Sequence, residues 1–270
     1  MARQRELLLT AKTAEKFDLY QRSLQAAESV RFLENRFRIL TGRSPRVLRE
    51  DFCGSAFNSC EFIKLHPKNR AIGIDLDDSA LRWCLQNNYP NLKESQWERI
   101  TLIKANVLIV ETPKADLIAA LNYSYAIFKK RSDLRRYLVK ARKSLVKGGA
   151  IMLDAASGTD LSEGFTFEGK CDEFNCISEW RAVDPISHDY VINISYLFKD
   201  GSWIRNAFIY EYRLWTLPEL QDLLLEAGFR DIHVIWGYRQ NNWEDLVFKR
   251  TRHARFNGAG ASYALVVGRA

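Results

Sequence analysis

The segment VLREDFCGSA, residues 47–56, decides the fold that we predict for this chain. Val47 and Leu48 open a short strand, and the polar turn around Gly54 leads into a helical pattern over Ala56 to Leu65. A tight turn between a strand end and a helix lets backbone N–H groups approach a nucleotide-like ligand. The segment therefore predicts the first strand–helix unit of a nucleotide-binding sheet.

A second marker follows about 20 residues after Gly54, at the spacing expected for a ribose-binding acid. Gly73-Ile74-Asp75 places an acidic residue at the end of the next predicted strand. We therefore expect Asp75 to hold a ribose hydroxyl pair. Capping of the following helix does not require this residue, since Asp77 or Asp78 can fill that role.

Short apolar runs continue to alternate with amphipathic stretches along the chain. The predicted strands are 47–48, 71–74, 100–103, 116–121 and 150–153, and the predicted helices are 56–65, 79–87 and one that Ser132 can cap and that ends before Gly148. Strands alternating with helices form βαβ units, hence a parallel, doubly wound sheet. Thr216 and Glu219 predict a capping box for a helix that stops at Gly228. The last two predicted strands are 231–236 and 263–267.

Between residues 153 and 216 the alternation with helices stops. Three strands are predicted here, over Phe174 to Val183, Asp189 to Phe198 and Trp203 to Trp215, with a hairpin turn at Lys199-Asp200-Gly201. They form an antiparallel β-meander that covers the sheet or serves as a contact surface. Its aromatic residues either line a substrate pocket or form a core; they are Phe174, Trp180, Tyr196, Phe208, Tyr210 and Tyr212.

The order of these elements resembles the class I S-adenosylmethionine-dependent methyltransferases over nearly the whole chain. Glu50-x-Phe52-x-Gly54-x-Ala56 occupies the place of the family's acidic, glycine-rich first motif, with only the central glycine kept. Phe52 and Ala56 carry a Cβ, so a positive φ would be costly there and we expect a loop of different shape. Asp51 can take over part of the acidic residue's role. Residues 145–149 and the string from Trp215 to Phe229 resemble further family segments, the latter common in small-molecule members.

The resemblance implies a fold, a cofactor and a set of contacts. The fold is an α/β, Rossmann-like, doubly wound and mostly parallel seven-stranded sheet with the antiparallel meander inserted. The cofactor is S-adenosyl-L-methionine, and Asn106 would offer its carbonyl oxygen to the adenine amino group. The implied cofactor-binding residues are Glu50, Cys53, Gly54, Asp75, Leu76, Asn106, Val107, Leu121 and Asn122.

The predicted elements divide the chain into four parts. Residues 1–45 form an N-terminal helical cap, in which Tyr20 and Gln21 are either cofactor contacts or ordinary packing residues. Residues 46–155 form the cofactor-binding α/β half, and residues 156–214 form the antiparallel insertion. Residues 215–270 supply the C-terminal helix and the strands that complete the sheet.

The implied reaction is in-line displacement of the methyl group by a nitrogen, oxygen or sulfur atom of an acceptor. A general base is needed only for a protonated nucleophile, and the candidates are Tyr125, Asp154 and His188. We take Tyr125 as the catalytic candidate. Asn122 and Tyr125 match the ends of the N-P-P-Y motif of base-methylating enzymes without its prolines, and Arg213 is a candidate carboxylate ligand.

The amino-acid composition does not decide which class of molecule accepts the methyl group. The net charge of +7 and the basic segment from Lys129 to Lys147 would suit a nucleic-acid substrate, although a solvated helix face also explains them. A small molecule is the favoured acceptor, and the alternatives are a nucleic-acid or protein substrate and a non-enzymatic protein that keeps the fold. The five scattered cysteines and four histidines predict no disulfide framework and no metal site. The sequence predicts neither a signal peptide nor a membrane span, so we expect a cytoplasmic protein, of unknown oligomeric state.

Overall fold

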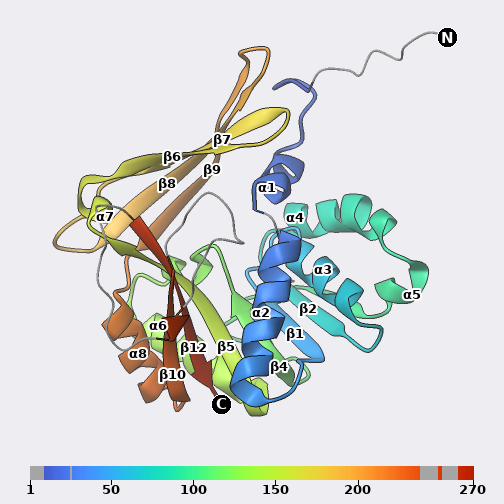
Figure 1. Cartoon of the computed structure of the whole chain (residues 1–270), viewed down its shortest axis with the longest axis vertical. Helices are drawn as coiled ribbons and strands as arrows, with labels where there is room; N and C mark the ends of the chain where they lie inside the picture. Colours follow the sequence, from blue (N-terminus) through green and yellow to red (C-terminus); the bar gives the residue numbers. More distant parts are fainter. Residues whose placement is uncertain (1–8, 25, 238–248, 251–260) are drawn as a thin grey trace.

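A twisted sheet runs through the centre of the molecule, and a smaller antiparallel sheet lies across one end of it (Figure 1). The computed structural model describes residues 9–24, 26–237, 249–250 and 261–270. The strands of the large sheet follow the order β3-β2-β1-β4-β5-β12-β10, with the two-residue β11 beside β10. Their bounds are β1 Val47–Asp51, β2 Arg70–Asp75, β3 Ile100–Lys104, β4 Ala115–Ala120, β5 Leu145–Gly158, β10 Arg230–Gly237, β11 Lys249–Arg250 and β12 Ala261–Arg269.

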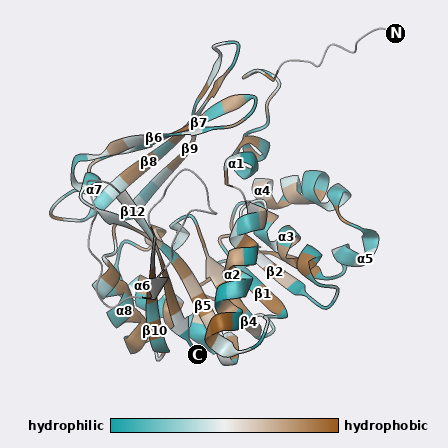
Figure 2. Ribbon diagram, in the orientation of Figure 1, coloured by the Kyte–Doolittle hydropathy of each residue, from teal (hydrophilic) through white to brown (hydrophobic). Residues whose placement is uncertain are grey.

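The predicted doubly wound, mostly parallel seven-stranded sheet is thus confirmed, and β11 adds a short edge strand. Strands β1 to β5 run parallel, whereas β12 pairs antiparallel with both β5 and β10. Every residue of β4, Ala115–Ala120, is buried, as expected for a strand covered on both faces. Figure 2 shows hydrophobic residues concentrated along these central strands.

Helices cover both faces of the large sheet. One face packs against α2, α3 and α4, and the opposite face packs against α6 and α8. The helix bounds are α1 Lys16–Leu24, α2 Ala26–Thr41, α3 Phe57–Leu65, α4 Asp78–Trp83, α5 Glu94–Trp97, α6 Arg131–Lys143, α7 Asp160–Glu163 and α8 Leu217–Glu226. The predicted capping box of α8 is confirmed, since the Thr216 hydroxyl accepts from the Glu219 N–H and the Glu219 carboxylate accepts from the Thr216 N–H.

Two predictions about α6 and β5 were wrong. Lys130 rather than Ser132 precedes the first helical residue, and no side chain caps this helix. Strand β5 begins at Leu145, well before residue 150, because an irregular pairing with β4 carries the strand through Gly148 and Gly149. It also continues to Gly158, since β12 pairs with it from residue 150 to residue 158.

The inserted meander has four strands instead of three. The predicted strands are present as β7 Phe174–Trp180, β8 Asp189–Phe198 and β9 Trp203–Arg213, and the hairpin between β8 and β9 is confirmed, with Gly201 at φ +81°. The additional strand, β6 Phe165–Lys170, pairs antiparallel with β7. Its short sequence FTFEGK alternates exposed and half-buried residues, which is the pattern of an edge strand. Within the described ranges, no helix is long and apolar enough to cross a membrane.

Candidate functional site

The loop after β1 has three alternating residues in the left-handed region. Phe52, Gly54 and Ala56 have φ values of +59°, +52° and +51°. We expected a positive φ to be costly at Phe52 and Ala56 because both carry a Cβ, yet both residues adopt one. A left-handed residue that carries a Cβ costs about 1–2 kcal/mol. Aromatic packing offsets part of this cost at Phe52, whose ring centroid lies 5.9 Å from that of Phe128 and 5.6 Å from that of Tyr137.

A buried ion pair between Arg49 and Asp51 lies at the end of β1, where the loop begins. Arg49, which is fully buried, donates through Nε to Oδ1 of Asp51 at 2.7 Å, and the Tyr137 hydroxyl donates to Oδ2 at 2.9 Å. Burial raises the pKa of Asp51, which the nearby Arg49 counteracts. Both carboxylate oxygens of Asp51 are therefore bound by other side chains of the protein, and Asp51 helps to position the loop.

Glu50 is a second buried carboxylate of the loop, and none of the ion pairs in the described part of the chain includes it. Its oxygens accept from Asn58 Nδ2 at 2.7 Å, from the Ser59 N–H at 2.9 Å and from the Ser59 hydroxyl at 2.6 Å. Burial raises the pKa of Glu50 to about 7, although these hydrogen bonds act in the opposite direction. The site thus holds a carboxylate that lacks a cationic partner.

The loop forms one wall of a pocket of about 830 Å³, here called the larger pocket. The other walls come from α1, the end of β4 and strand β9. Its acidic lining residues are Glu50, Asp51, Asp75, Asp77 and Glu211. The one cation among its described lining residues, Lys129, donates to Asp189 at 2.9 Å. The larger pocket therefore carries an excess of negative charge.

Six of the nine predicted cofactor residues line the larger pocket: Glu50, Cys53, Gly54, Asp75, Leu121 and Asn122. The Gly54 N–H donates to Asp75 Oδ2 at 2.6 Å, so the loop and the end of β2 are fixed to each other. The other three lie outside this lining. Leu76 is 66% exposed, Val107 is buried in the core, and Oδ1 of Asn106 accepts from the Leu108 N–H at 2.9 Å.

Helix α1 forms one wall of the larger pocket. Tyr20 and Gln21 both line it, and Gln21 Nε2 donates to the Ser55 hydroxyl at 2.9 Å. Arg22 donates to Glu173 beside the meander at 2.5 Å. The helix therefore connects the loop after β1 with the insertion.

A second cavity, of about 160 Å³, adjoins the first and is here called the smaller pocket. Side chains from α1 and α2, from the ends of β4, β5 and β12 and from all four strands of the meander surround it. The residues that line both pockets are Tyr20, Leu24, Asn58, Leu121, Asn122 and Tyr210. Two ligands could therefore meet at this common wall.

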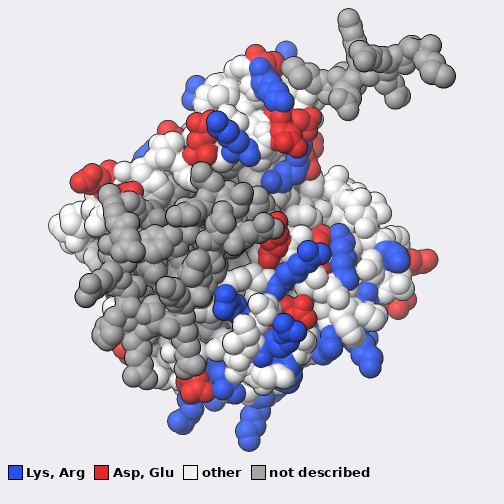
Figure 3. All heavy atoms as spheres, in the orientation of Figure 1, with Lys and Arg blue, Asp and Glu red and all other residues white. Residues whose placement is uncertain are grey.

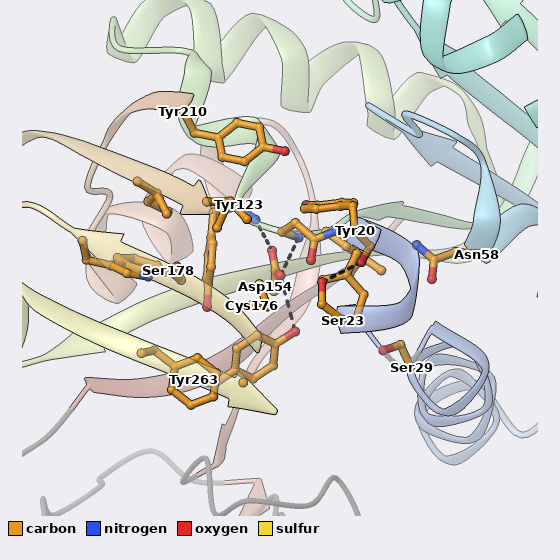
Figure 4. A pocket seen from close by; sticks show the side chains of 18 of the residues that line it. Tyr20, Ser23, Ser29, Asn58, Tyr123, Asp154, Cys176, Ser178, Tyr210 and Tyr263 are labelled. Carbon is orange, nitrogen blue, oxygen red and sulfur yellow. Dashed lines mark hydrogen bonds between the residues drawn. The ribbon is translucent and has the colours of Figure 1, made fainter. Parts of the chain in front are cut away.

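Asp154 lies at the centre of the smaller pocket, between Tyr123 and Tyr263 (Figure 4). Its carboxylate accepts from the backbone N–H of Asn122 at 2.6 Å and of Tyr123 at 2.8 Å, and more weakly from the Tyr263 hydroxyl at 3.5 Å. Asn122 and Tyr123 are both left-handed, with φ values of +56° and +59°. Such strained residues cluster at functional sites. Burial raises the pKa of Asp154 to about 7.

The other two base candidates lie elsewhere. Tyr125 is 2% exposed, belongs to the hydrophobic core and lines neither pocket. The structure gives it no access to a substrate there, and it does not stack in the manner of an N-P-P-Y aromatic in these pockets. His188 occupies the turn before β8 and also lines neither pocket. Tyr123, which the sequence analysis did not single out by itself, takes the position facing Asp154.

The meander residues divide between pocket and core. Trp180, Phe208, Tyr210 and Tyr212 line one or both pockets, whereas Phe174 and Tyr196 are buried in the core. Arg213 stacks on Trp215 with its guanidinium carbon 4.0 Å from the ring centroid, and it donates to Glu219 at 3.3 Å. Its predicted role as a ligand for a substrate carboxylate gains no support from these contacts.

The basic helix α6 is balanced by acids. Arg131 and Arg135 pair with Glu226, Arg136 pairs with Asp133, and Lys140 pairs with Glu111. Figure 3 shows basic and acidic side chains interspersed on the face it views. Over the described part of the chain, no group of three or more histidine, cysteine or acidic side chains could hold a metal ion.

No protein-family model matches this chain, and a search of curated proteins finds none with a similar sequence. Solved structures do match. A S-adenosylmethionine-dependent methyltransferase from Clostridium acetobutylicum ATCC 824 is 17% identical, over 93% of this chain and 97% of its own, with a TM-score of 0.61. An amino pentose methyltransferase from Micromonospora echinaspora is 12% identical, over 98% and 99%, with a TM-score of 0.66. A sugar N-methyltransferase from Streptoalloteichus sp ATCC 53650 is 16% identical, over 100% and 98%, with a TM-score of 0.62. The chain has the fold of the class I S-adenosylmethionine-dependent methyltransferases.

Proposed function

We propose that this protein is a S-adenosylmethionine-dependent methyltransferase whose acceptor is a small molecule. The observation that carries the proposal is the pair of adjoining pockets with a common wall at Leu121 and Asn122. The larger pocket would hold the cofactor and the smaller pocket the acceptor. The amino pentose and sugar specificities of two structural neighbours support an acceptor of this size.

The charge of the larger pocket supports this cofactor over a dinucleotide. S-adenosylmethionine carries a positive sulfonium and a positive ammonium group against a single carboxylate, so an acidic pocket attracts it. A pyrophosphate would instead face five carboxylates, with the one lining cation, Lys129, already paired with Asp189. Glu50 would then gain the cationic partner that its buried carboxylate lacks.

The elements around the larger pocket would have separate tasks. Asp75 would accept hydrogen bonds from the ribose hydroxyls, because the Gly54 and Asp77 N–H groups already hold its carboxylate in place. Helix α1, through Tyr20 and Gln21, would exclude water from the bound cofactor. When bound, the cofactor supplies an activated methyl group, and the protein's task is to align the acceptor in line with it.

Calorimetric titration with S-adenosylmethionine and S-adenosylhomocysteine tests this function. We expect both to bind, and we expect Asp75→Ala to weaken both by about tenfold or more, since it removes the ribose acceptor. Asp172→Ala, a change at an exposed acidic residue outside both pockets, is the control and should bind normally. A folded native protein that binds neither compound would contradict the proposal.

A further inference from the structure

Among its described lining residues, the smaller pocket contains a buried carboxylate and no opposite charge. Asp154 is 3% exposed, and none of the ion pairs within the described residues includes it. No lysine, arginine or histidine is among the described residues that line this pocket. The other buried aspartate near the site, Asp51, is paired with Arg49. A buried carboxylate without a cation is costly, and a cationic ligand would relieve that cost.

The carboxylate of Asp154 has capacity left for a ligand. Its two oxygens can accept about four hydrogen bonds, and the protein supplies two short ones, from Asn122 and Tyr123, with a weaker third from Tyr263. In Figure 4 Tyr20 and Ser23 lie on the opposite side of Asp154 from Tyr123. The remaining lone pairs are therefore available to a donor that enters the pocket.

The walls around this carboxylate suit an amine. Several aromatic rings line the pocket, among them Tyr123 after β4, Trp180 of β7 and Tyr263 of β12. The electron-rich face and the hydroxyl groups of such rings accept ammonium groups favourably. A cavity of about 150 Å³ admits a molecule as large as benzene, so a pocket of about 160 Å³ would accept an amine with one small ring or one chain end.

We propose that the smaller pocket binds a primary or secondary amine and that Asp154 receives the proton which this amine loses. The inference rests on the proposed methyltransferase function. The bound ammonium first passes one proton to the Asp154 carboxylate, which frees the nitrogen lone pair. This lone pair then forms the new N–CH3 bond while the S–CH3 bond breaks and its electron pair stays on sulfur. The products are the methylated ammonium, protonated Asp154 and S-adenosylhomocysteine.

An amine suits this site better than an alcohol. A carboxylate whose pKa lies near 7 is matched to an ammonium group, which titrates only a few units higher. An alcohol holds its proton much more tightly, so the same carboxylate would be a poor base for it. Positive charge on the amine also pairs with Asp154 before any methyl transfer, which makes binding alone a sufficient test.

The test is binding of two matched pairs, benzylamine with benzyl alcohol and cyclohexylamine with cyclohexanol, followed by NMR at pH 8 with and without S-adenosylhomocysteine. We expect each amine to bind about tenfold more tightly than its alcohol. Asp154→Asn should abolish this preference. Equal binding of amine and alcohol, or binding of none of the four probes, would overturn the inference.

Tyr263→Phe provides a variant that keeps the carboxylate and the fold. The Tyr263 hydroxyl lowers the pKa of Asp154, so its removal raises that pKa. As the pH falls, Asp154 of the variant should therefore become neutral, and amine binding should be lost, at a higher pH than in the native protein. A merely structural role of Asp154 would leave this pH dependence unmoved and would refute the proposal. Failure of S-adenosylhomocysteine to bind the native protein would instead contradict the methyltransferase function, because the titrations without it test the smaller pocket separately.

Discussion

At the scale of single residues, Gly54 and Gly201 offer a matched pair. Both have a positive φ, +52° and +81°, and a Cβ added at either would meet no atom within 4 Å. Gly54→Ala and Gly201→Ala should therefore each lower the free energy of unfolding by about 1 kcal/mol, through backbone strain alone. Urea denaturation measures this loss.

Only one of these two changes should affect the cofactor. The open space beside Gly54 belongs to the larger pocket, whereas Gly201 lies in the turn between β8 and β9. We expect Gly54→Ala to weaken binding of S-adenosylhomocysteine at least severalfold, and Gly201→Ala to leave it unchanged. Equal affinities for the two variants would show that the ligand does not approach this backbone.

The titration of Glu50 predicts a pH dependence of cofactor affinity. Its pKa is raised to about 7, so the carboxyl group is mostly neutral at pH 6 and mostly charged at pH 8. A cationic cofactor should therefore bind more tightly as the pH rises through 7. In Glu50→Gln this dependence should be reduced, because the amide does not titrate. Asn58 can turn its own amide to present oxygen to the new side chain, so the hydrogen bond between the two residues should be kept. Calorimetry at pH 6 and pH 8 measures the cofactor affinity. If the affinity of the variant depends on pH as strongly as that of the native protein, Glu50 is not the group that titrates.

The residues at the site were only partly predictable from the sequence. Asp75 and Gly54 follow from spacing along two adjacent parallel strands, and they do contact each other. The left-handed Phe52 was not predictable, because its conformation depends on packing against Tyr137, which lies far along the chain. Local preference indicated a different loop, and tertiary contacts overrode it.

At the scale of elements, the capping box at Thr216 gives a prediction that should leave the site unaffected. Thr216→Ala removes the hydroxyl that accepts from the Glu219 N–H at the start of α8. We expect a loss of about 1 kcal/mol in unfolding free energy, measured by urea denaturation, with cofactor affinity unchanged because α8 lines neither pocket. Thr159→Ala, before the short α7 where no side chain caps the helix, should cost much less.

Elements with strong periodicity were the most predictable. The central strands read as continuous apolar runs, and their burial on both faces explains why. The extent of β5 was not predictable, because its last residues are extended through pairing with β12, over a hundred positions away. Strand β6 was not predicted, because a six-residue edge strand buries little apolar surface and so has no strong hydrophobic pattern in its sequence.

At the scale of the whole molecule, the net charge of +7 need not serve nucleic-acid binding. Four cations of α6 pair with acids on neighbouring positions. We expect a fluorescent 20-nucleotide RNA to bind more weakly than about 10 μM at 0.15 M salt, as measured by anisotropy. Tight binding that survives this salt concentration would favour a nucleic-acid acceptor instead.

The smaller pocket is the feature that the sequence could least reveal. Tyr123 follows β4, Asp154 belongs to β5 and Tyr263 to β12, and only the sheet order brings these three residues together. The sequence offered Asp154 as one of three candidate bases, of which Tyr125 was taken as the catalytic residue. The burial of Tyr125 depends on how the insertion and the large sheet pack, which no local pattern encodes.

The lining of the smaller pocket has a consequence for protein engineering. All four meander strands contribute side chains to the smaller pocket, whereas the loop of residues 50–57 contributes none. Directed evolution confined to β6, β7 and β8 would therefore reshape the smaller pocket while the loop and its buried ion pair stay intact. The chain could in this way serve as a scaffold whose selectivity is varied in one sheet and whose stability is maintained by the other.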